Sequence, residues 1–307
     1  MESVLITGAS GMLGSSIKQQ AIAKNWNFLA PTRNELDLSD TKSTFDFVRD
    51  NKIKTVIHCA AKVGGIQANI NHPADFILEN SRIDVSVINA CRTAEVSKLI
   101  YFGSSCMYPR LIRQPMLESD ILSGALEPTN EGYALAKILA AKSVQSVARQ
   151  DGLDWRVLIL SNLYGPGDNF DIESSHLIPA VIRKVNLAVK QGFDSIDIWG
   201  DGQARREFTY VQDVAEFVVN NISQAGNWDL LMNVGIGIDY SINEYYEFVG
   251  ELLGFKGTFV NDFDRPEGMK QKLMDSSRAR KHRWDPKTDL KQGLERTIKW
   301  FKIHYQE

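Results

Sequence analysis

The stretch Ser3-Val4-Leu5-Ile6-Thr7-Gly8-Ala9-Ser10-Gly11-Met12-Leu13-Gly14 decides the expected fold of this chain. A short apolar run that ends at a glycine is typical of a buried parallel strand, and helical periodicity follows from Met12 to about Asn25. Glycines between such a strand and helix allow a tight turn and let the backbone approach a pyrophosphate, which the helix N-terminus attracts. The pattern predicts a dinucleotide-binding turn; the alternative is a tight turn that binds nothing. The residues expected at the cofactor are Gly8, Gly11, Met12, Leu13 and Gly14.

The strand and helix patterns go on alternating along the chain. Apolar runs at 27–30, 55–58, 99–102 and 155–160 predict strands, and helices are predicted after Asp40, from Pro73 and over 130–150. This order predicts an α/β fold, a doubly wound parallel sheet of the Rossmann type. Beyond Ser161 the alternation weakens. We therefore expect residues 1–162 to form mainly the dinucleotide-binding domain and 163–307 a smaller, interleaved substrate-binding region, with segments near 200–235 returning to the first domain.

Composition narrows the classes of function. A net charge of −3 argues against a nucleic-acid-binding protein, which needs a clustered basic face. No stretch approaches the roughly 20 apolar residues of a membrane span, and the start of the sequence lacks the features of a signal peptide, so a cytoplasmic protein is expected. Three widely spaced cysteines fit neither a disulfide framework nor a zinc site, and no bound metal is expected.

The end of the second predicted strand indicates which nicotinamide cofactor binds. NAD sites usually have an acidic residue there for the ribose 2′-hydroxyl, but no acid occurs here before Glu35. Arg33 instead offers a planar cation to a 2′-phosphate, which favours NADP(H). The alternative is that Arg33 is an ordinary surface charge. Asp37 and Leu38, after the turn, are expected to border the adenine.

Tyr133 and Lys137 have the spacing of neighbours on one face of a helix. A nearby ammonium lowers the pKa of a phenol, which then donates a proton to a carbonyl oxygen as hydride reaches the carbon. The same lysine can hold the nicotinamide ribose. Ser104 and Ser105 follow the fourth predicted strand, and one of these hydroxyls can share the substrate oxygen with Tyr133. Together with the glycine loop, these residues predict a site for hydride transfer.

Further motifs lie along nearly the whole chain. They are Ala60-Ala61-Lys62-Val63-Gly64-Gly65-Ile66, Gly103-Ser104-Ser105-Cys106-Met107-Tyr108-Pro109, Glu127-Pro128-Thr129-Asn130-Glu131-Gly132-Tyr133, Asn162-Leu163-Tyr164-Gly165-Pro166, His176-Leu177-Ile178-Pro179-Ala180, Arg206-Glu207-Phe208, Asn233-Val234-Gly235 and Asp275-Ser276-Ser277-Arg278. With these motifs the sequence resembles the extended short-chain dehydrogenases, and within them the GDP-L-fucose synthases.

The resemblance implies a two-step chemistry. Such enzymes take GDP-4-keto-6-deoxy-D-mannose, epimerise C3 and C5, and then reduce C4 with NADPH. By motif, Ser104, Tyr133 and Lys137 would be the reducing triad, and Cys106 and His176 the acid and base of epimerisation. The C4 ketone acidifies the neighbouring C–H groups, and a thiol and an imidazole, with ordinary pKa values of roughly 8.5 and 6.5, suit proton exchange near neutral pH. The alternatives are a buried apolar role for Cys106 and a helix-cap or surface role for His176.

The resemblance also implies further contacts. Cofactor contacts are expected at Ala60, Ala61, Tyr133, Lys137, Asn162 and His176. Substrate contacts are expected at Ser105, Asn162, Lys184, Trp199, Arg206 and Lys272, the cations meeting the diphosphate.

Three positions depart from the usual pattern of these enzymes. Lys184 replaces an arginine, Met107 replaces an isoleucine, and Gly132 replaces a proline or tryptophan, which would enlarge the site around the sugar. A C4-reductase of another GDP-4-keto sugar, such as a 6-deoxy-heptose, without epimerisation, is therefore an open alternative.

Two other classes of function compete with this interpretation. A nucleotide-sugar epimerase that recycles bound NAD would rarely need Arg33 and would lack the cysteine–histidine pair. A regulator that kept the fold but lost the chemistry would usually have lost Tyr133 or Lys137, and both are present. The resemblance implies a homodimer that pairs through the helix carrying Tyr133 and the long helix before it.

Overall fold

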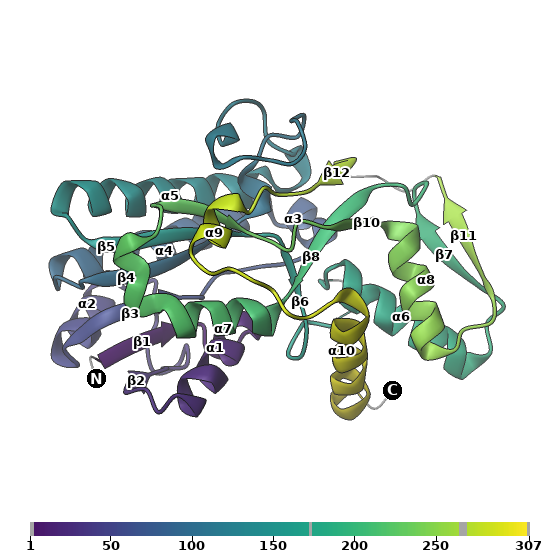
Figure 1. Cartoon of the computed structure of the whole chain (residues 1–307), viewed down its shortest axis with the longest axis horizontal. Coiled ribbons are helices and arrows are strands. Elements are labelled where there is room, and N and C mark those ends of the chain that lie inside the picture. Colours follow the sequence, from purple (N-terminus) through teal and green to yellow (C-terminus); the bar gives the residue numbers. More distant parts are fainter. Residues whose placement is uncertain (1–2, 172–173, 264–268, 306–307) are drawn as a thin grey trace.

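A six-stranded parallel sheet forms the larger part of the molecule (Figure 1). The computed structural model describes residues 3–171, 174–263 and 269–305. The strand order is β2-β1-β3-β4-β5-β9. The strands are β1 (Ser3–Thr7), β2 (Phe28–Leu29), β3 (Ile53–His58), β4 (Lys98–Ser104), β5 (Asp154–Leu160) and β9 (Leu231–Val234). The doubly wound parallel sheet expected from the sequence is confirmed.

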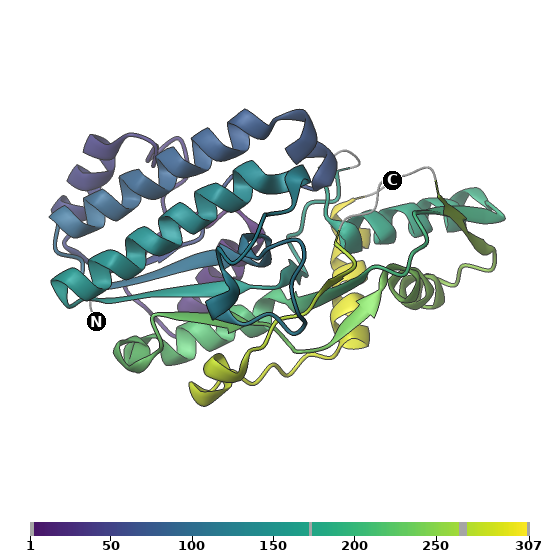
Figure 2. The ribbon, with the colours of Figure 1, turned by 90° about the horizontal axis from the view of Figure 1, so that it is seen from above.

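Helices cover both faces of this sheet. On one face lie α2 (Thr41–Asp50), α4 (Pro73–Thr93) and α5 (Glu131–Asp151), and Figure 2 shows α4 and α5 side by side along the sheet. On the other face α1 (Met12–Ala23) packs against α7 (Val211–Asn221). Each face has its own apolar core, because strands buried on both sides carry apolar side chains in both directions.

The helices and strands predicted from the sequence match those of the structure, with small differences at their ends. Asp40 caps α2, accepting hydrogen bonds from the backbone N–H groups of Lys42 and Ser43. The strand predicted at 27–30 is shorter, since β2 lies at the sheet edge and pairs only with β1. The inner face of α4 buries Phe76 and Val87 as expected, but it also buries Asn80 and Asp84. Polar side chains at these inner positions need partners within the protein.

A smaller region lies at the right of Figure 1 and has a third apolar core. Its strands form two small sheets: β6 (Asn162–Tyr164), β8 (Arg205–Tyr210), β10 (Asp239–Ser241) and β12 (Gln271–Lys272) in one, β7 (Ser195–Trp199) and β11 (Thr258–Asp262) in the other. Its helices are α6 (Leu177–Gln191), α8 (Ile242–Leu253) and α10 (Leu290–His304). The short helices α3 (Ile66–Asn71) and α9 (Ser277–Lys281) lie in the connecting segments.

The chain passes between the two regions more than once. After β8, in the smaller region, it forms α7 and β9 on the main sheet and then returns as β10. The boundary at residue 162 stays a prediction. Within the described ranges no helix is long and apolar enough to cross a membrane.

Two glycines of the first turn set the approach of α1 to the sheet. Gly8 has a φ of +63°, and a Cβ there would lie 2.6 Å from the backbone nitrogen of Ala60, the second residue after β3. A Cβ on Gly14 would lie 2.2 Å from the carbonyl oxygen of Gly8. These two positions require glycine because backbone atoms, which cannot move aside like a flexible side chain, occupy the space.

We expect Gly14→Ala to destabilise the protein by roughly 1–3 kcal/mol, the usual cost of forcing an extra methyl into a packed site. Gly11→Ala is the matched control, because its Cβ would lie 3.4 Å from the same Gly8 oxygen and its φ of −80° suits alanine. Urea unfolding without cofactor measures both free energies. Equal losses for the two variants would show that the close approach at Gly14 is not what requires glycine there.

Candidate active site

The ends of β1 and β3 are tied together at the carboxyl edge of the sheet. The Thr7 hydroxyl oxygen accepts hydrogen bonds from the backbone N–H groups of Cys59 (3.1 Å) and Ala60 (3.3 Å). The half-buried Ala60 and Ala61 thereby lie beside the glycine turn. Parallel sheets of this type bind ligands at this edge.

The first turn of α1 is open to a ligand. Its N-cap residue, Gly11, makes no side-chain cap, and no acidic residue lies in the first turn. The backbone N–H groups there and the positive end of the helix dipole favour an anion. The predicted residues Met12, Leu13 and Gly14 form this turn.

Both acidic residues near the end of β2 are engaged locally. Glu35 accepts hydrogen bonds from the backbone N–H (2.7 Å) and the hydroxyl (2.9 Å) of Thr32, and these bonds lower its pKa. Asp37 accepts from the backbone N–H and the hydroxyl of Ser39, which lowers the pKa of Asp37. Arg33 is exposed and forms no ion pair within the described part of the chain. Its guanidinium is the free cation of this turn, and Leu38 packs against the core.

Ser104 and Tyr133 meet above the sheet. Ser104 ends β4, Tyr133 lies in the first turn of α5, and a hydrogen bond between their side chains lowers the pKa of Tyr133. Burial acts in the opposite direction and more strongly, and the nearby groups of Cys106 and Asp84 add to it. The net pKa of Tyr133 is raised.

The lowering of the Tyr133 pKa by Lys137 that we expected from their spacing is therefore wrong. The Lys137 ammonium lies 4.7 Å from the ring centroid of Tyr101 on β4, and the titratable groups that act on it are Asp84 and Cys59. Helical spacing puts Tyr133 and Lys137 on one face of α5, but the groups packed around α5 decide where the Lys137 ammonium lies.

Gly132 also has a different explanation from the expected enlargement of the sugar site. A Cβ at this position would lie 2.9 Å from the carbonyl oxygen of Pro73 and 3.4 Å from the Cβ of Ile77. The glycine thus allows the first turn of α5 to approach the start of α4.

Cys106 is held by contacts from three directions. It lies in the short turn η1 (Ser105–Met107), and its backbone N–H donates to the Ser104 hydroxyl oxygen at 3.3 Å. The side-chain amide of Asn130 donates to the Cys106 sulfur at 3.1 Å, and the Lys272 ammonium lies 3.8 Å from it. The contact with Asn130 was not predicted, although this residue lies inside the motif that precedes Tyr133.

His176 directly precedes α6 and lies in the same environment. His176 is exposed, but desolvation by the protein around it lowers its pKa, and the charge of Lys272 lowers that pKa further. The neutral imidazole is therefore favoured at neutral pH. The loop before His176 is held by Gly65, whose N–H donates to the Ser174 carbonyl oxygen and whose missing side chain leaves room for Ser175.

The predicted substrate residues lie in different surroundings. Arg206 is half-buried, and burial lowers its pKa while Cys106 and Glu127 oppose that effect. Asn162 donates to the Glu207 carbonyl oxygen at 3.3 Å, and Trp199 is exposed at the end of β7. The structure thus brings Arg206 and Lys272 to Cys106.

Two predicted substrate residues are engaged elsewhere. The Lys184 ammonium forms an ion pair with Asp197 on β7, at 2.7 Å. Ser105 is only 3% exposed, so Ser104 is the serine that is open to the site. Neither the Lys184 ammonium nor the Ser105 hydroxyl is therefore free to bind a diphosphate or a sugar.

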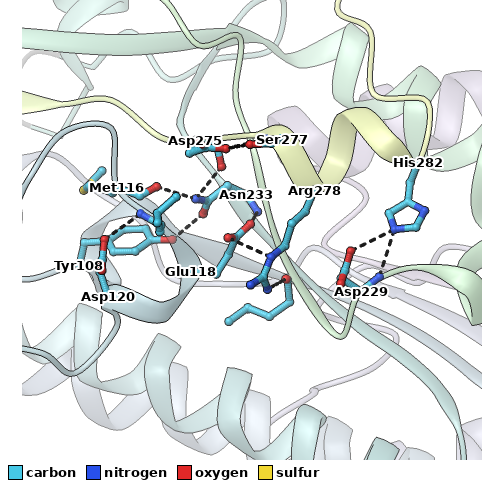
Figure 3. Close-up of polar contacts among 12 residues, drawn as sticks. Tyr108, Met116, Glu118, Asp120, Asp229, Asn233, Asp275, Ser277, Arg278 and His282 are labelled. Atoms are coloured by element: carbon cyan, nitrogen blue, oxygen red, sulfur yellow. Dashed lines mark hydrogen bonds and ion pairs between the residues drawn. The ribbon is translucent and has the colours of Figure 1, made fainter.

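Asn233 on β9 holds two loops at the edge of the site (Figure 3). Its side-chain amide donates to the carbonyl oxygens of Met116 and Asp275, both at 3.0 Å, and accepts from the Tyr108 hydroxyl at 2.6 Å. Its backbone N–H donates to Glu118 at 2.8 Å. Tyr108 follows Cys106 closely and Asp275 follows Lys272 closely, so Asn233 fixes the segments that carry both.

Arg278 completes this network. Its guanidinium pairs with Glu118 at 3.4 Å and donates to the Leu231 carbonyl oxygen at 3.2 Å. The motifs at 233–235 and 275–278 therefore hold the site together. In the described ranges no group of histidine, cysteine and acidic side chains could hold a metal ion.

Comparison with known proteins agrees with this geometry. Residues 4–235 match the NAD dependent epimerase/dehydratase family. GDP-L-colitose synthase of Yersinia pseudotuberculosis is 42% identical, covering 97% of each chain. GDP-L-fucose synthase of Escherichia coli K12 is 41% identical, covering 97% of this chain and 96% of its own.

A GDP-mannoheptose C4 reductase from Campylobacter jejuni, solved with NADP bound, has a TM-score of 0.87 and 31% identity, covering 98% of each chain. Sequence and structure comparisons thus lead to the same group of proteins. The chain belongs to the NAD dependent epimerase/dehydratase family, among the extended short-chain dehydrogenases.

Proposed function

We propose that this protein is an NADPH-dependent epimerase/reductase of a GDP-linked 4-keto-6-deoxy sugar. It would epimerise C3 and C5 and then reduce C4, giving GDP-L-fucose or a close relative. The observation that carries the proposal is the contact between the two sets of residues. The Cys106 backbone N–H donates to the Ser104 hydroxyl oxygen, and Cys106 acts electrostatically on Tyr133, which supports one site for the acid–base and reducing groups.

The residues at the sheet edge fit NADPH. The glycine turn and the uncapped start of α1 would hold the pyrophosphate, and Arg33 would hold the 2′-phosphate. Tyr133 and Lys137 would border the nicotinamide ribose. Bound NADPH supplies the hydride, and the chain's own residues position the ketone and provide the proton.

Tyr133 is suited to provide that proton. Burial raises its pKa, so the phenol is protonated at neutral pH and can donate to the ketone oxygen as negative charge develops there. Ser104, which is hydrogen-bonded to Tyr133, provides a second group for the same oxygen. Tyr133 can therefore act as the acid without first taking up a proton from solvent.

Cys106 and His176 are suited to exchange protons at C3 and C5. Asn130 and Lys272 hold the Cys106 sulfur in place, and the lowered pKa of His176 keeps its imidazole neutral. One group can remove a proton while the other returns one on the opposite face of the sugar. Lys272 and Arg206 would also meet the nucleotide diphosphate.

C4 reduction without epimerisation is the second candidate function. The similarity to a GDP-mannoheptose C4 reductase favours it. A heptose-linked 4-keto sugar would then be the substrate.

The chain would act as a cytoplasmic homodimer. The outer faces of the neighbouring helices α4 and α5 expose Leu78, Val85, Leu135 and Leu139, an apolar surface of the kind that pairs with a second copy. All three cysteines are free thiols, as in a reducing compartment.

We expect the protein to bind NADPH more tightly than NADH, and Arg33→Ala to narrow the difference by weakening only NADPH. Fluorescence titration of both cofactors measures the four affinities. Lys24→Ala, which removes an exposed cation at the other end of α1, is the control and should change neither. Equal affinities of the wild-type protein for both cofactors would contradict the role of Arg33.

Tyr133→Phe removes the proton donor, so reduction of the 4-keto sugar should fall by roughly 10²–10⁴-fold or more. NADPH binding should change little, because the glycine turn and Lys137 remain. Nicotinamide absorbance follows the reduction, and a direct titration follows binding. A variant that reduces the ketone at nearly the wild-type rate would exclude Tyr133 from proton transfer.

Cys106→Ser and His176→Asn should abolish proton exchange at C3 and C5. In deuterated water without NADPH, the wild-type protein should incorporate deuterium at both carbons, and Tyr133→Phe should retain this exchange. Cys106→Ser should still reduce the ketone, giving a product with its original C3 and C5 configuration. Mass spectrometry and NMR of the sugar distinguish these outcomes.

The pH dependence of this exchange provides a further check. Because the pKa of His176 lies below its usual value of about 6.5, the neutral base persists to lower pH, and exchange should decline only below that value. A wild-type protein that reduces the ketone without incorporating deuterium would instead establish the second candidate function.

A further inference from the structure

A buried polar cluster lies beneath the reducing residues. We call it the Asp84 cluster; its members are Thr7, His58, Asp84, Tyr101 and Lys137. They come from β1, β3, α4, β4 and α5, and none is more than 4% exposed. The proposed reaction assigns a task only to Lys137, so the other four require an explanation.

Hydrogen bonds define the arrangement around Asp84. One carboxylate oxygen lies 3.0 Å from Nε2 of His58, and the other accepts from the Tyr101 hydroxyl at 2.7 Å. The Nδ1 atom of His58 lies 2.7 Å from the Thr7 hydroxyl oxygen. That oxygen already accepts two backbone N–H groups, so its own proton is directed at Nδ1 and the ring proton of His58 at Asp84.

In the described ranges no lysine or arginine is hydrogen-bonded to Asp84; its carboxylate accepts from the His58 ring and from the Tyr101 hydroxyl. Among the lysines and arginines, Lys137 acts on the Asp84 carboxylate, and its ammonium lies 4.7 Å from the centroid of the Tyr101 ring. A buried charge is costly unless an opposite charge compensates it.

Each of these two charges opposes the effect that burial has on the pKa of the other. Burial would raise the pKa of Asp84, but Lys137, His58 and Tyr101 together hold it below its ordinary value. Burial lowers the pKa of Lys137, and Asp84 opposes this effect, with a smaller contribution from Cys59. These are the charged and titratable groups that act on the lysine from α4 and from the end of β3.

We propose that Asp84 is a positioning residue that keeps the Lys137 ammonium charged and in place, with His58, Tyr101 and Thr7 orienting the carboxylate. This role rests on the proposed function, since Lys137 needs its charge to hold the nicotinamide ribose. The cluster also links the lysine to Thr7, the residue directly before the glycine turn. Both halves of the cofactor site thereby share one buried support.

The test is the titration of Lys137 itself. In protein labelled with [6-¹³C]lysine, the Lys137 signal is assigned by its loss in Lys137→Met and followed by NMR against pH. Asp84→Asn removes the charge but keeps the shape, and should lower the Lys137 pKa by about one unit or more. The alkaline limb of the pH profile for ketone reduction should move to lower pH by the same amount.

Tyr101→Phe is the matched control, because it removes one hydrogen bond to Asp84 and keeps the carboxylate. It should shift the Lys137 pKa by much less than Asp84→Asn. If Asp84→Asn does not fold, Asp84→Ser leaves room for water, and the same shift is expected. The proposal would be overturned if a folded variant without the Asp84 carboxylate had an unchanged Lys137 pKa.

The NMR measurement needs no substrate, so it separates this proposal from the proposed function. A wild-type protein that reduces no GDP-4-keto sugar would contradict the function, while the Lys137 titration would still decide the role of Asp84. Equal shifts in Tyr101→Phe and Asp84→Asn would indicate that hydrogen bonding alone supports the lysine, and would also overturn the role of the charge.

Discussion

The buried side chain of Asn233 is the interaction on which the candidate site depends. Its amide satisfies backbone groups of two segments that lie far apart in the sequence, one close after Cys106 and one close after Lys272. A buried amide bound on both its oxygen and its nitrogen has one orientation, and leaving either end unpaired is costly. The two segments also pair with each other directly through the backbone of Met116, and Asn233 adds the contact that fixes this pair to β9 on the main sheet.

Burial also determines the protonation states at this site. It raises the pKa of Tyr133, and desolvation by the surrounding protein together with the charge of Lys272 lowers that of the exposed His176, so at neutral pH the phenol holds its proton and the imidazole is free to accept one. The same low polarity makes each uncompensated charge costly. The charges of Asp84 and Lys137 occur together beneath Tyr133 for this reason, and their separation from solvent makes the lysine sensitive to one carboxylate.

Several residues singled out by the resemblance have structural explanations. Gly132 allows close packing of α5 on the start of α4, and Lys184 is paired with Asp197. Ser105 is buried beneath the turn that carries Cys106. Lys184 and Ser105 match positions of binding residues by motif, but their surroundings engage the one and bury the other. A match in a motif gives the position of a residue along the chain and leaves its contacts open.

Local patterns in the sequence by themselves determined the order of strands and helices, the glycine turn and the helical spacing of Tyr133 and Lys137. Each depends on residues close together in the chain, such as the apolar run before Gly8 or the cap at Asp40. Only the tertiary structure decided that Asn130 and Lys272 meet at Cys106, and that Lys137 faces Tyr101 and Asp84 instead of lowering the Tyr133 pKa. These contacts join elements far apart in sequence, and the balance between burial and charge at each group exists only once those elements have packed.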